Sequence, residues 1–211
     1  MKTSNCRMGI LAGATPAVLS AVVQGVETVK DLVARIKSKD DSIRGAAWQT
    51  AESAGALAVR PLAEVMMDPD FETARAAKRA LYRIVRHAGR PGAKHEAEAV
   101  TGELVLVLGS APAPVRREAM WMLSEIAGDK AVAAMATMLA DPEVREDARC
   151  ALMRLSGSKA TSAFKAAFAK APEEFKYALA ETLRERGIKV NGYPSQKLVP
   201  NRKTTVGESA G

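Results

Sequence analysis

Apolar and polar residues alternate along the chain in a pattern that occurs five times. In each copy an apolar residue precedes Arg or Lys, further apolar residues follow four, eight and eleven positions after the first, and Gly closes the segment. One copy runs from Val115 to Gly128 and the next from Val144 to Gly157. Positions with this spacing lie on one face of a helix that turns by about 100° per residue. Each copy therefore predicts an amphipathic helix that ends at a glycine.

The other three copies follow the same pattern with small departures. They start at Ile43, Ala77 and Phe175. In the last copy Arg186 stands where an apolar residue is expected. This departure fits a terminal unit that has no neighbour to cover it.

A second, shorter apolar segment precedes each patterned helix, and turn signals such as Asp141-Pro142 join the two. The unit is thus helix, turn, helix, and a two-helix unit cannot bury its apolar face alone. Successive units are therefore expected to stack. The sequence predicts an all-α chain, with an α-solenoid of about five two-helix repeats over residues 16–187. A flexible N-terminal segment (1–15) and an extended or disordered basic tail (188–211) are expected on either side.

The unit "DPEVREDARCALMRLSG" (141–157) resembles the HEAT repeats, specifically the short HEAT-like repeats of the phycobilisome lyase type. Asp-Pro, Val-Arg, a following Ala, a Leu and the closing Gly carry the resemblance, which covers roughly residues 26–187. It implies a right-handed superhelix whose second helices line a concave face where partners bind. It implies no chemistry, because the family mixes scaffolds, lyase subunits and a few DNA-repair enzymes.

The N-terminal segment has some features of a secretory signal, because Lys2 and Arg7 precede a mostly apolar run. Gly, Thr and Pro interrupt that run, however. Apolar residues at helical spacing also continue through any later cleavage point: Leu19, Val22, Val26, Val29, Val33 and Ile36. This spacing favours an amphipathic helix that starts at Thr15-Pro16 over a cleaved signal.

No motif in the sequence carries recognisable catalytic or metal-binding chemistry. His87 and His95 lie outside any His-Glu-x-x-His motif, and no cysteine pairs with them at metal-ligand spacing. Cys6 and Cys150 set up no disulfide framework, which fits a reducing, cytoplasmic compartment. No segment has the ~18 uninterrupted apolar residues of a membrane span. We therefore expect a non-enzymatic protein without metal or cofactor; an enzyme whose site is assembled from several repeats is the disfavoured alternative.

One stretch, "ARAAKRALYRIVRHAGRPGAKH" (74–95), is distinguished by its charge. It holds seven basic and no acidic residues, and these seven equal the net charge of +7 of the whole chain. Its arginines recur at 4-4-3-4 spacing and form one stripe: Arg75, Arg79, Arg83, Arg86 and Arg90. The turn at Asp68-Pro69 lies eight residues before Ala77, so this helix is expected to start near Phe71 and to be longer than the others.

The stripe predicts a site for an anionic partner, because charges of one sign concentrate electrostatic potential in a groove. At equivalent positions of the next unit, Arg117 and Trp121 are expected beside it. Alternatively, Trp121 packs against an adjacent helix, as is expected for Trp48. For the arginines themselves, the alternative is that they are solvated or paired within the chain. Four glutamates are available for such pairing: Glu52, Glu125, Glu146 and Glu181.

These observations favour an adaptor that binds another protein with an acidic surface on its concave face. The alternative is a nucleic-acid binder, possible also in a DNA-repair form, in which the same arginines contact phosphates and Trp121 stacks on a base. Outside the stripe the chain is neutral, whereas a nucleic-acid binder usually spreads basic charge along its groove, so the adaptor is favoured. A bilin-lyase-like role is a third hypothesis that depends on the family resemblance alone.

Overall fold

The computed structural model describes residues 28–195, and every regular element within them is helical. A helical segment over residues 28–36 comes first. The α-helices that follow are α2 (Asp41–Gln49), α3 (Val59–Val65), α4 (Phe71–Ala88), α5 (Lys94–Ser110), α6 (Ala113–Ile126), α7 (Val132–Thr137), α8 (Arg145–Met153), α9 (Ser158–Lys170) and α10 (Glu173–Glu185). Three 3-10 helices lie between them: η1 (Ala51–Ala58), η2 (Gly128–Lys130) and η3 (Met138–Ala140). The all-α prediction is confirmed for these residues, whereas the expected helix start at residue 16 and the segment 1–15 lie outside them.

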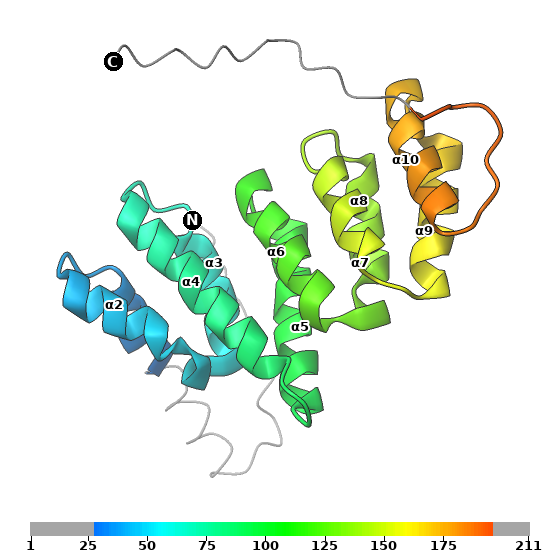
Figure 1. Ribbon diagram of the computed structural model, residues 1–211. Helices are drawn as coiled ribbons and strands as arrows, with labels where there is room; N and C mark the ends of the chain where they lie inside the picture. Colours follow the sequence, from blue (N-terminus) through cyan, green and yellow to red (C-terminus); the bar gives the residue numbers. More distant parts are fainter. Residues whose placement is uncertain (1–27, 196–211) are drawn as a thin grey trace, which may run out of the picture.

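The helices form two layers that follow the chain (Figure 1). In one layer α2, α4, α6 and α8 contact one another in that order, and in the other α3, α5, α7 and α9 do the same. Contacts between α3 and α4, α5 and α6, α7 and α8, and α9 and α10 join the layers. Each helix thus meets mainly helices that are close to it in the sequence.

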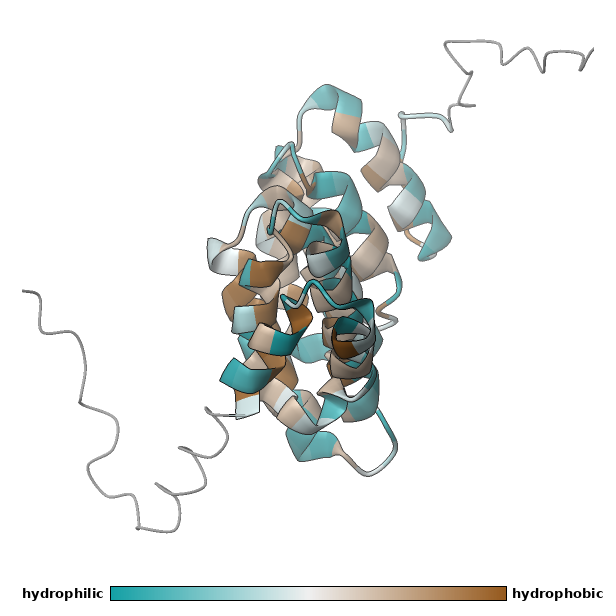
Figure 2. Ribbon diagram, turned by 90° about the vertical axis from the view of Figure 1, so that its left-hand side faces the viewer, coloured by the Kyte–Doolittle hydropathy of each residue, from teal (hydrophilic) through white to brown (hydrophobic). Residues whose placement is uncertain are grey.

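A continuous cluster of buried apolar residues runs through the helices, in the register that the repeated pattern predicts. Leu123 in α6 and Leu152 in α8 occupy equivalent positions of the pattern, and both are 0% exposed. In Figure 2 the hydrophobic positions (brown) lie along the helices, and the loops are mostly hydrophilic (teal). The local period of the sequence therefore decides which face of these helices is buried.

In α2 the register fails at Ile43, the first position of the repeated pattern. Ile43 is 45% exposed, although the pattern places it on the apolar face, and Arg44 is buried beside it. The Arg44 guanidinium donates to the carbonyl oxygen of Ser38 at 2.7 Å and pairs with Asp41. The Ser38 carbonyl before the helix and the Asp41 carboxylate in its first turn supply polar partners for the Arg44 guanidinium, so that Arg44 is buried and Ile43 is exposed.

The closing glycines have two different structural roles. Gly55 interrupts η1 with φ 57° and ψ −153°, a backbone conformation that is essentially restricted to glycine. Gly89 follows α4 with an ordinary φ of −78°. A Cβ atom on Gly89 would lie 2.8 Å from the Cγ2 methyl of Ile126. Gly55 is therefore required by the backbone, and Gly89 by the close approach of α6.

Arg186 replaces the expected apolar residue of the last unit, but the interpretation that this position has no neighbour to cover it is wrong. Its guanidinium donates to the carbonyl oxygens of Leu152 and Met153 at 3.0 and 3.3 Å, and also to that of Leu155. Carbonyl groups at a helix C-terminus have no partner within the helix, so a cation satisfies them well. Arg186 also lies 5.2 Å from the ring centroid of Phe164 and thereby ties the end of α10 to α8 and α9.

Residues 188–195 contain no helix and lie against α9 and α10. The Tyr193 ring meets Phe168 and Tyr177 edge to face, at centroid distances of 5.4 and 5.2 Å. The Arg184 guanidinium donates to the Tyr193 carbonyl, and Ser195 donates to Glu181. The first part of the expected tail is thus packed, and the rest lies outside the described residues.

No helix among residues 28–195 has both the length and the apolar character needed to cross a membrane.

Candidate partner-binding groove

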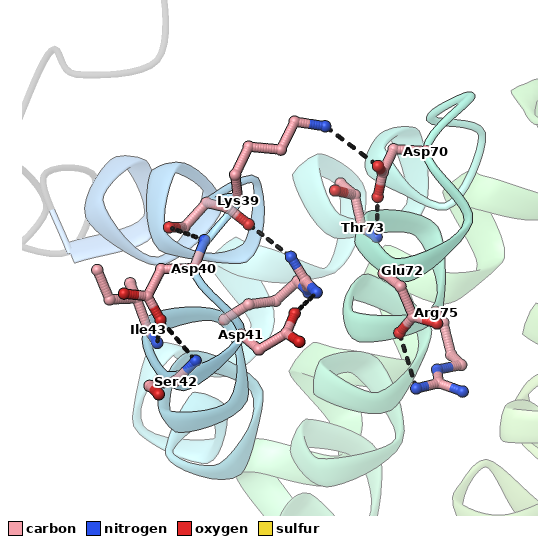
Figure 3. A network of polar contacts seen from close by, with 11 residues as sticks. Lys39, Asp40, Asp41, Ser42, Ile43, Asp70, Glu72, Thr73 and Arg75 are labelled. Carbon is pink, nitrogen blue, oxygen red and sulfur yellow. Dashed lines mark hydrogen bonds and ion pairs between the residues drawn. The ribbon is translucent and has the colours of Figure 1, made fainter.

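The helix that carries the arginine stripe starts where the sequence predicts, at Phe71, and at 18 residues α4 is the longest helix among the described residues. Asp70 caps it by accepting a hydrogen bond from the Thr73 backbone N–H at 2.8 Å (Figure 3). Lys39 pairs with the same carboxylate at 3.1 Å. These hydrogen bonds, first that from Thr73 and then that from Lys39, lower the pKa of Asp70 to about 2. The Asp70 carboxylate is therefore ionised at neutral pH and stabilises the start of the helix.

A groove of about 900 Å³ lies beside α4, between α2, the end of α3 and the start of α6. Basic side chains of α4 form one wall: Arg75, Lys78, Arg79, Arg83 and Arg86. Apolar and aromatic side chains form most of the rest: Trp48, Met66, Phe71, Ala74, Tyr82, Pro114 and Val115. Glu118 is the one acidic residue in this lining. The groove thus combines positive charge with accessible apolar surface.

Lys78 and four of the five arginines of the stripe are already paired with glutamates. The N–O distances are 2.7 Å for Arg75–Glu72, 2.5 Å for Lys78–Glu118, 2.9 Å for Arg83–Glu52, 3.7 Å for Arg86–Glu125 and 2.7 Å for Arg90–Glu96. Four of these five glutamates come from η1, α5 and α6, and only Glu72 belongs to α4 itself. The hydrogen bonds from Arg83 lower the pKa of Glu52, and those from Arg90 lower the pKa of Glu96. Pairing within the chain, the alternative hypothesis from the sequence, therefore describes these cations.

Arg79 differs from the other cations of α4. Among residues 28–195 it has no ion pair, and its guanidinium lies 5.2 Å from the ring centroid of the half-buried Trp48. Stacking of this kind holds a guanidinium through its flat face and leaves its N–H groups available for a planar anion. Arg79 is thus an oriented but uncompensated positive charge inside the groove.

Two further cation–aromatic contacts follow the same helix. Arg75 lies 5.7 Å from the ring centroid of Phe71, and Arg86 lies 5.2 Å from that of Tyr82. Burial, followed by the nearby charge of Glu118, raises the pKa of the Tyr82 hydroxyl, which donates to Glu118 at 3.0 Å. Phe71 and Tyr82 are therefore in contact with the same network that neutralises most of the cations of the groove, whereas Trp48 contacts Arg79.

Arg117 and Trp121 lie in a second groove of about 520 Å³, between α6 and α8. Lys78, Tyr82 and Glu118 line both grooves, so the two adjoin. The second groove has a different charge, because Glu146 and Asp147 line it and Asp147 pairs with Arg117 at 3.2 Å.

Trp121 itself is 42% exposed, and the Arg154 guanidinium lies 4.8 Å from its ring centroid. The structure thus places Arg117 and Trp121 next to the stripe, in an environment of their own. Arg90, at the other end of the stripe, does not line either groove and instead pairs with Glu96, which also lies 3.8 Å from the His87 ring nitrogen.

Trp48, Tyr82 and Phe71 are site residues that the sequence analysis did not select. Trp48 and Tyr82 occupy the same place in their units, five positions after the first apolar residue of the pattern. This equivalent position in two successive units is the sequence signal that could have predicted two aromatic side chains in the same groove. Phe71 precedes the pattern in the longer helix of its unit and is 71% exposed, so only its exposure in the structure reveals it.

Metal chemistry finds no support in this region. Residues 28–195 contain no group of three His, Cys, Asp or Glu side chains that could hold a metal ion. Cys150 is a free, exposed thiol at the second groove.

No protein-family model matches the chain. No curated protein matches it. Among solved structures, the chain is similar to a crystal structure of an engineered protein, a target of the Northeast Structural Genomics Consortium. The identity is 21%, the match covers 83% of this chain and 85% of that chain, and the TM-score is 0.37. A second engineered protein from the same consortium is 22% identical over 83% of this chain, with a TM-score of 0.39. This chain spans 51% of the length of that second protein.

Proposed function

We propose that the chain is a protein-interaction adaptor, a right-handed solenoid of about five HEAT-like repeats that binds an acidic partner protein in the groove beside α4. The groove carries the proposal, because it joins an uncompensated guanidinium, Arg79, to accessible aromatic side chains. Arg and aromatic residues dominate the binding energy of protein interfaces.

The repeated register and the order of helix contacts support the solenoid. Equivalent positions such as Leu123 and Leu152 are buried in successive units. Helices of each layer also contact one another in chain order, as in stacked repeats.

The ion pairs of the stripe favour a protein over a nucleic acid. A nucleic-acid backbone presents many phosphates, and affinity for it grows with the number of free cations that neutralise them. Five of the cations in this stretch already have a glutamate partner within 4.0 Å. One free guanidinium beside apolar surface suits a carboxylate on a folded or extended polypeptide better than a run of phosphates.

The test is affinity capture from nuclease-treated lysate of the source cells, with three immobilised proteins: wild type, Arg79→Glu and Lys94→Glu. Both variants replace one exposed cation of residues 74–95 by an acid, but only Arg79 lines the groove. We expect a specific protein in the wild-type and Lys94→Glu captures and its loss from the Arg79→Glu capture. Circular dichroism establishes that all three proteins are equally helical.

The proposal is overturned if the three proteins capture the same partners. It is also overturned if, without nuclease, the wild type retains oligonucleotides with an affinity that Arg79→Glu abolishes and retains no protein.

A further inference from the structure

Among residues 28–195, the groove beside α4 has one positive charge without an ion pair, that of Arg79, next to an accessible apolar surface. This combination limits which ligands fit the groove. Arg79 keeps all its N–H groups free of carboxylates among the described residues, whereas the cations on either side are paired. A single carboxylate would therefore find one strong partner here, with charge-assisted hydrogen bonds in the fork geometry that guanidinium groups favour.

Part of the apolar lining of the groove comes from the end of α3 and the start of α4, before Arg79 in the chain. Phe71 is 71% exposed, and it lines the groove together with Met66 from the end of α3. Met67, the neighbour of Met66, is 47% exposed. Exposed side chains of this size beside a cation are typical of a binding surface rather than of solvated helix faces.

The volume of the groove limits the size of the ligand that it can hold. A volume of about 900 Å³ is at the upper end of the range of small-molecule pockets, which is about 300–1,000 Å³. Its walls come from helices of three successive units, and it is open to solvent rather than enclosed. Such a shape takes a few consecutive residues of a polypeptide.

On the basis of the proposed function, we propose that the groove recognises a short acidic–apolar segment of its partner. One Asp or Glu side chain binds the Arg79 guanidinium, which Trp48 holds in place. A bulky apolar side chain of the same segment packs on Phe71 and Met66. Charge complementarity selects the carboxylate, and the exposed Phe71 ring supplies the apolar contact.

The experiment uses an array of acetylated, amidated octapeptides in a Ser/Gly background, each with one Glu and one Phe at varied spacing. Matched arrays replace Glu by Gln or Phe by Ala, and a fourth array lacks Glu but ends in a free carboxylate. Hits are resynthesised with a fluorophore, and their dissociation constants for the full chain are measured by fluorescence anisotropy.

We expect some spacings to bind the wild type about tenfold or more tightly than their Gln counterparts, the usual effect of removing a charged hydrogen-bond partner. Arg79→Gln should abolish this preference for Glu and leave the preference for Phe, and Phe71→Ala should do the reverse. Thermal unfolding shows that both variants are folded. If the peptides with a free C-terminal carboxylate bind more tightly than the Glu peptides, the inference of a side-chain carboxylate is overturned, and the group that Arg79 binds is a chain terminus.

The inference is overturned if no peptide binds, if Glu and Gln peptides bind equally, or if Arg79→Gln retains the preference for Glu. If the capture of a protein from lysate still depends on Arg79 in that case, the proposed function stands, and only the short segment is excluded as the ligand. A labelled oligonucleotide that binds more tightly than every peptide, and whose affinity falls in Arg79→Gln, would remove both.

Discussion

Glu52 in η1 accepts two hydrogen bonds from the guanidinium of Arg83 in α4, at 2.9 and 3.2 Å, across 31 residues of sequence. This pair compensates the charge of Arg83, which lines the groove, whereas Glu52 itself is not a lining residue. Single glutamates of neighbouring units thus determine whether an arginine of the stripe is paired within the chain or is available to a partner.

Glu52→Gln should therefore release Arg83 and strengthen the binding of a Glu-containing peptide several-fold. Partly exposed ion pairs contribute about 0–1 kcal/mol, so the free energy of unfolding should fall by no more than about that amount. Fluorescence anisotropy and denaturant unfolding measure the two effects. Glu103→Gln is the matched control, because it breaks the Arg60–Glu103 pair away from the groove. Equal peptide affinity in the two variants would contradict the expectation.

Leu152→Ala should lower the free energy of unfolding by ~2–5 kcal/mol, because Leu152 is fully buried and the truncation leaves a cavity. Leu106→Ala removes the same atoms from a side chain that is 52% exposed, and should have a small effect. Urea unfolding followed by circular dichroism measures both. Similar midpoints for the two variants would show that the register of α8 is misassigned.

Gly55→Ala should destabilise the protein by ~1–3 kcal/mol through backbone strain alone, because φ is 57° and no atom lies within 4 Å of the added Cβ. Gly45→Ala provides the opposite case. Gly45 lies inside α2 and also has open space around a Cβ, so alanine should stabilise the helix by ~0.5–1 kcal/mol. Unfolding midpoints that shift in the same direction for both variants would refute the argument.

The lowered pKa of Asp70 predicts a stability that depends on pH. A carboxylate whose pKa is lower in the folded state stabilises that state above its unfolded pKa of about 3.9, and this contribution disappears as the pH falls toward about 2. The melting temperature of Asp70→Asn should thus fall less between pH 5 and pH 2 than that of the wild type. Asn remains a good helix cap, so the comparison isolates the charge. An NMR titration that gives Asp70 a pKa near 3.9 would contradict this account.

Arg186→Met should lower the free energy of unfolding by ~1–3 kcal/mol, because it leaves the carbonyl oxygens at the end of α8 without their charged donor. Methionine keeps most of the apolar stem over Phe164, so the loss reports the hydrogen bonds. Lys165→Met, on the exposed face of α9, is the control and should change little. Hydrogen exchange should also show faster opening at the end of α8 in Arg186→Met alone.

Several features of the fold follow from local sequence alone. The period of apolar residues determines which face of α4, α6 and α8 is buried, because a helix fixes the direction of each side chain relative to its neighbours. Asp68-Pro69 and the cap at Asp70 likewise determine that α4 begins at Phe71. These are effects over a few residues, and they require no knowledge of the partner helices.

Only the tertiary structure decides what the arginine stripe does. The sequence places Arg75, Arg79, Arg83 and Arg86 on one face of α4. The charges of Arg83 and Arg86, however, are balanced by Glu52 and Glu125, which lie far away along the chain. The same holds for the hydrogen bonds from Arg186 to the last residues of α8. Ion pairing and stacking depend on distances of a few ångströms between helices, which the period of one helix does not contain. For that reason the sequence determined the basic face, and the packing of the helices singled out Arg79, on Trp48, as its free charge.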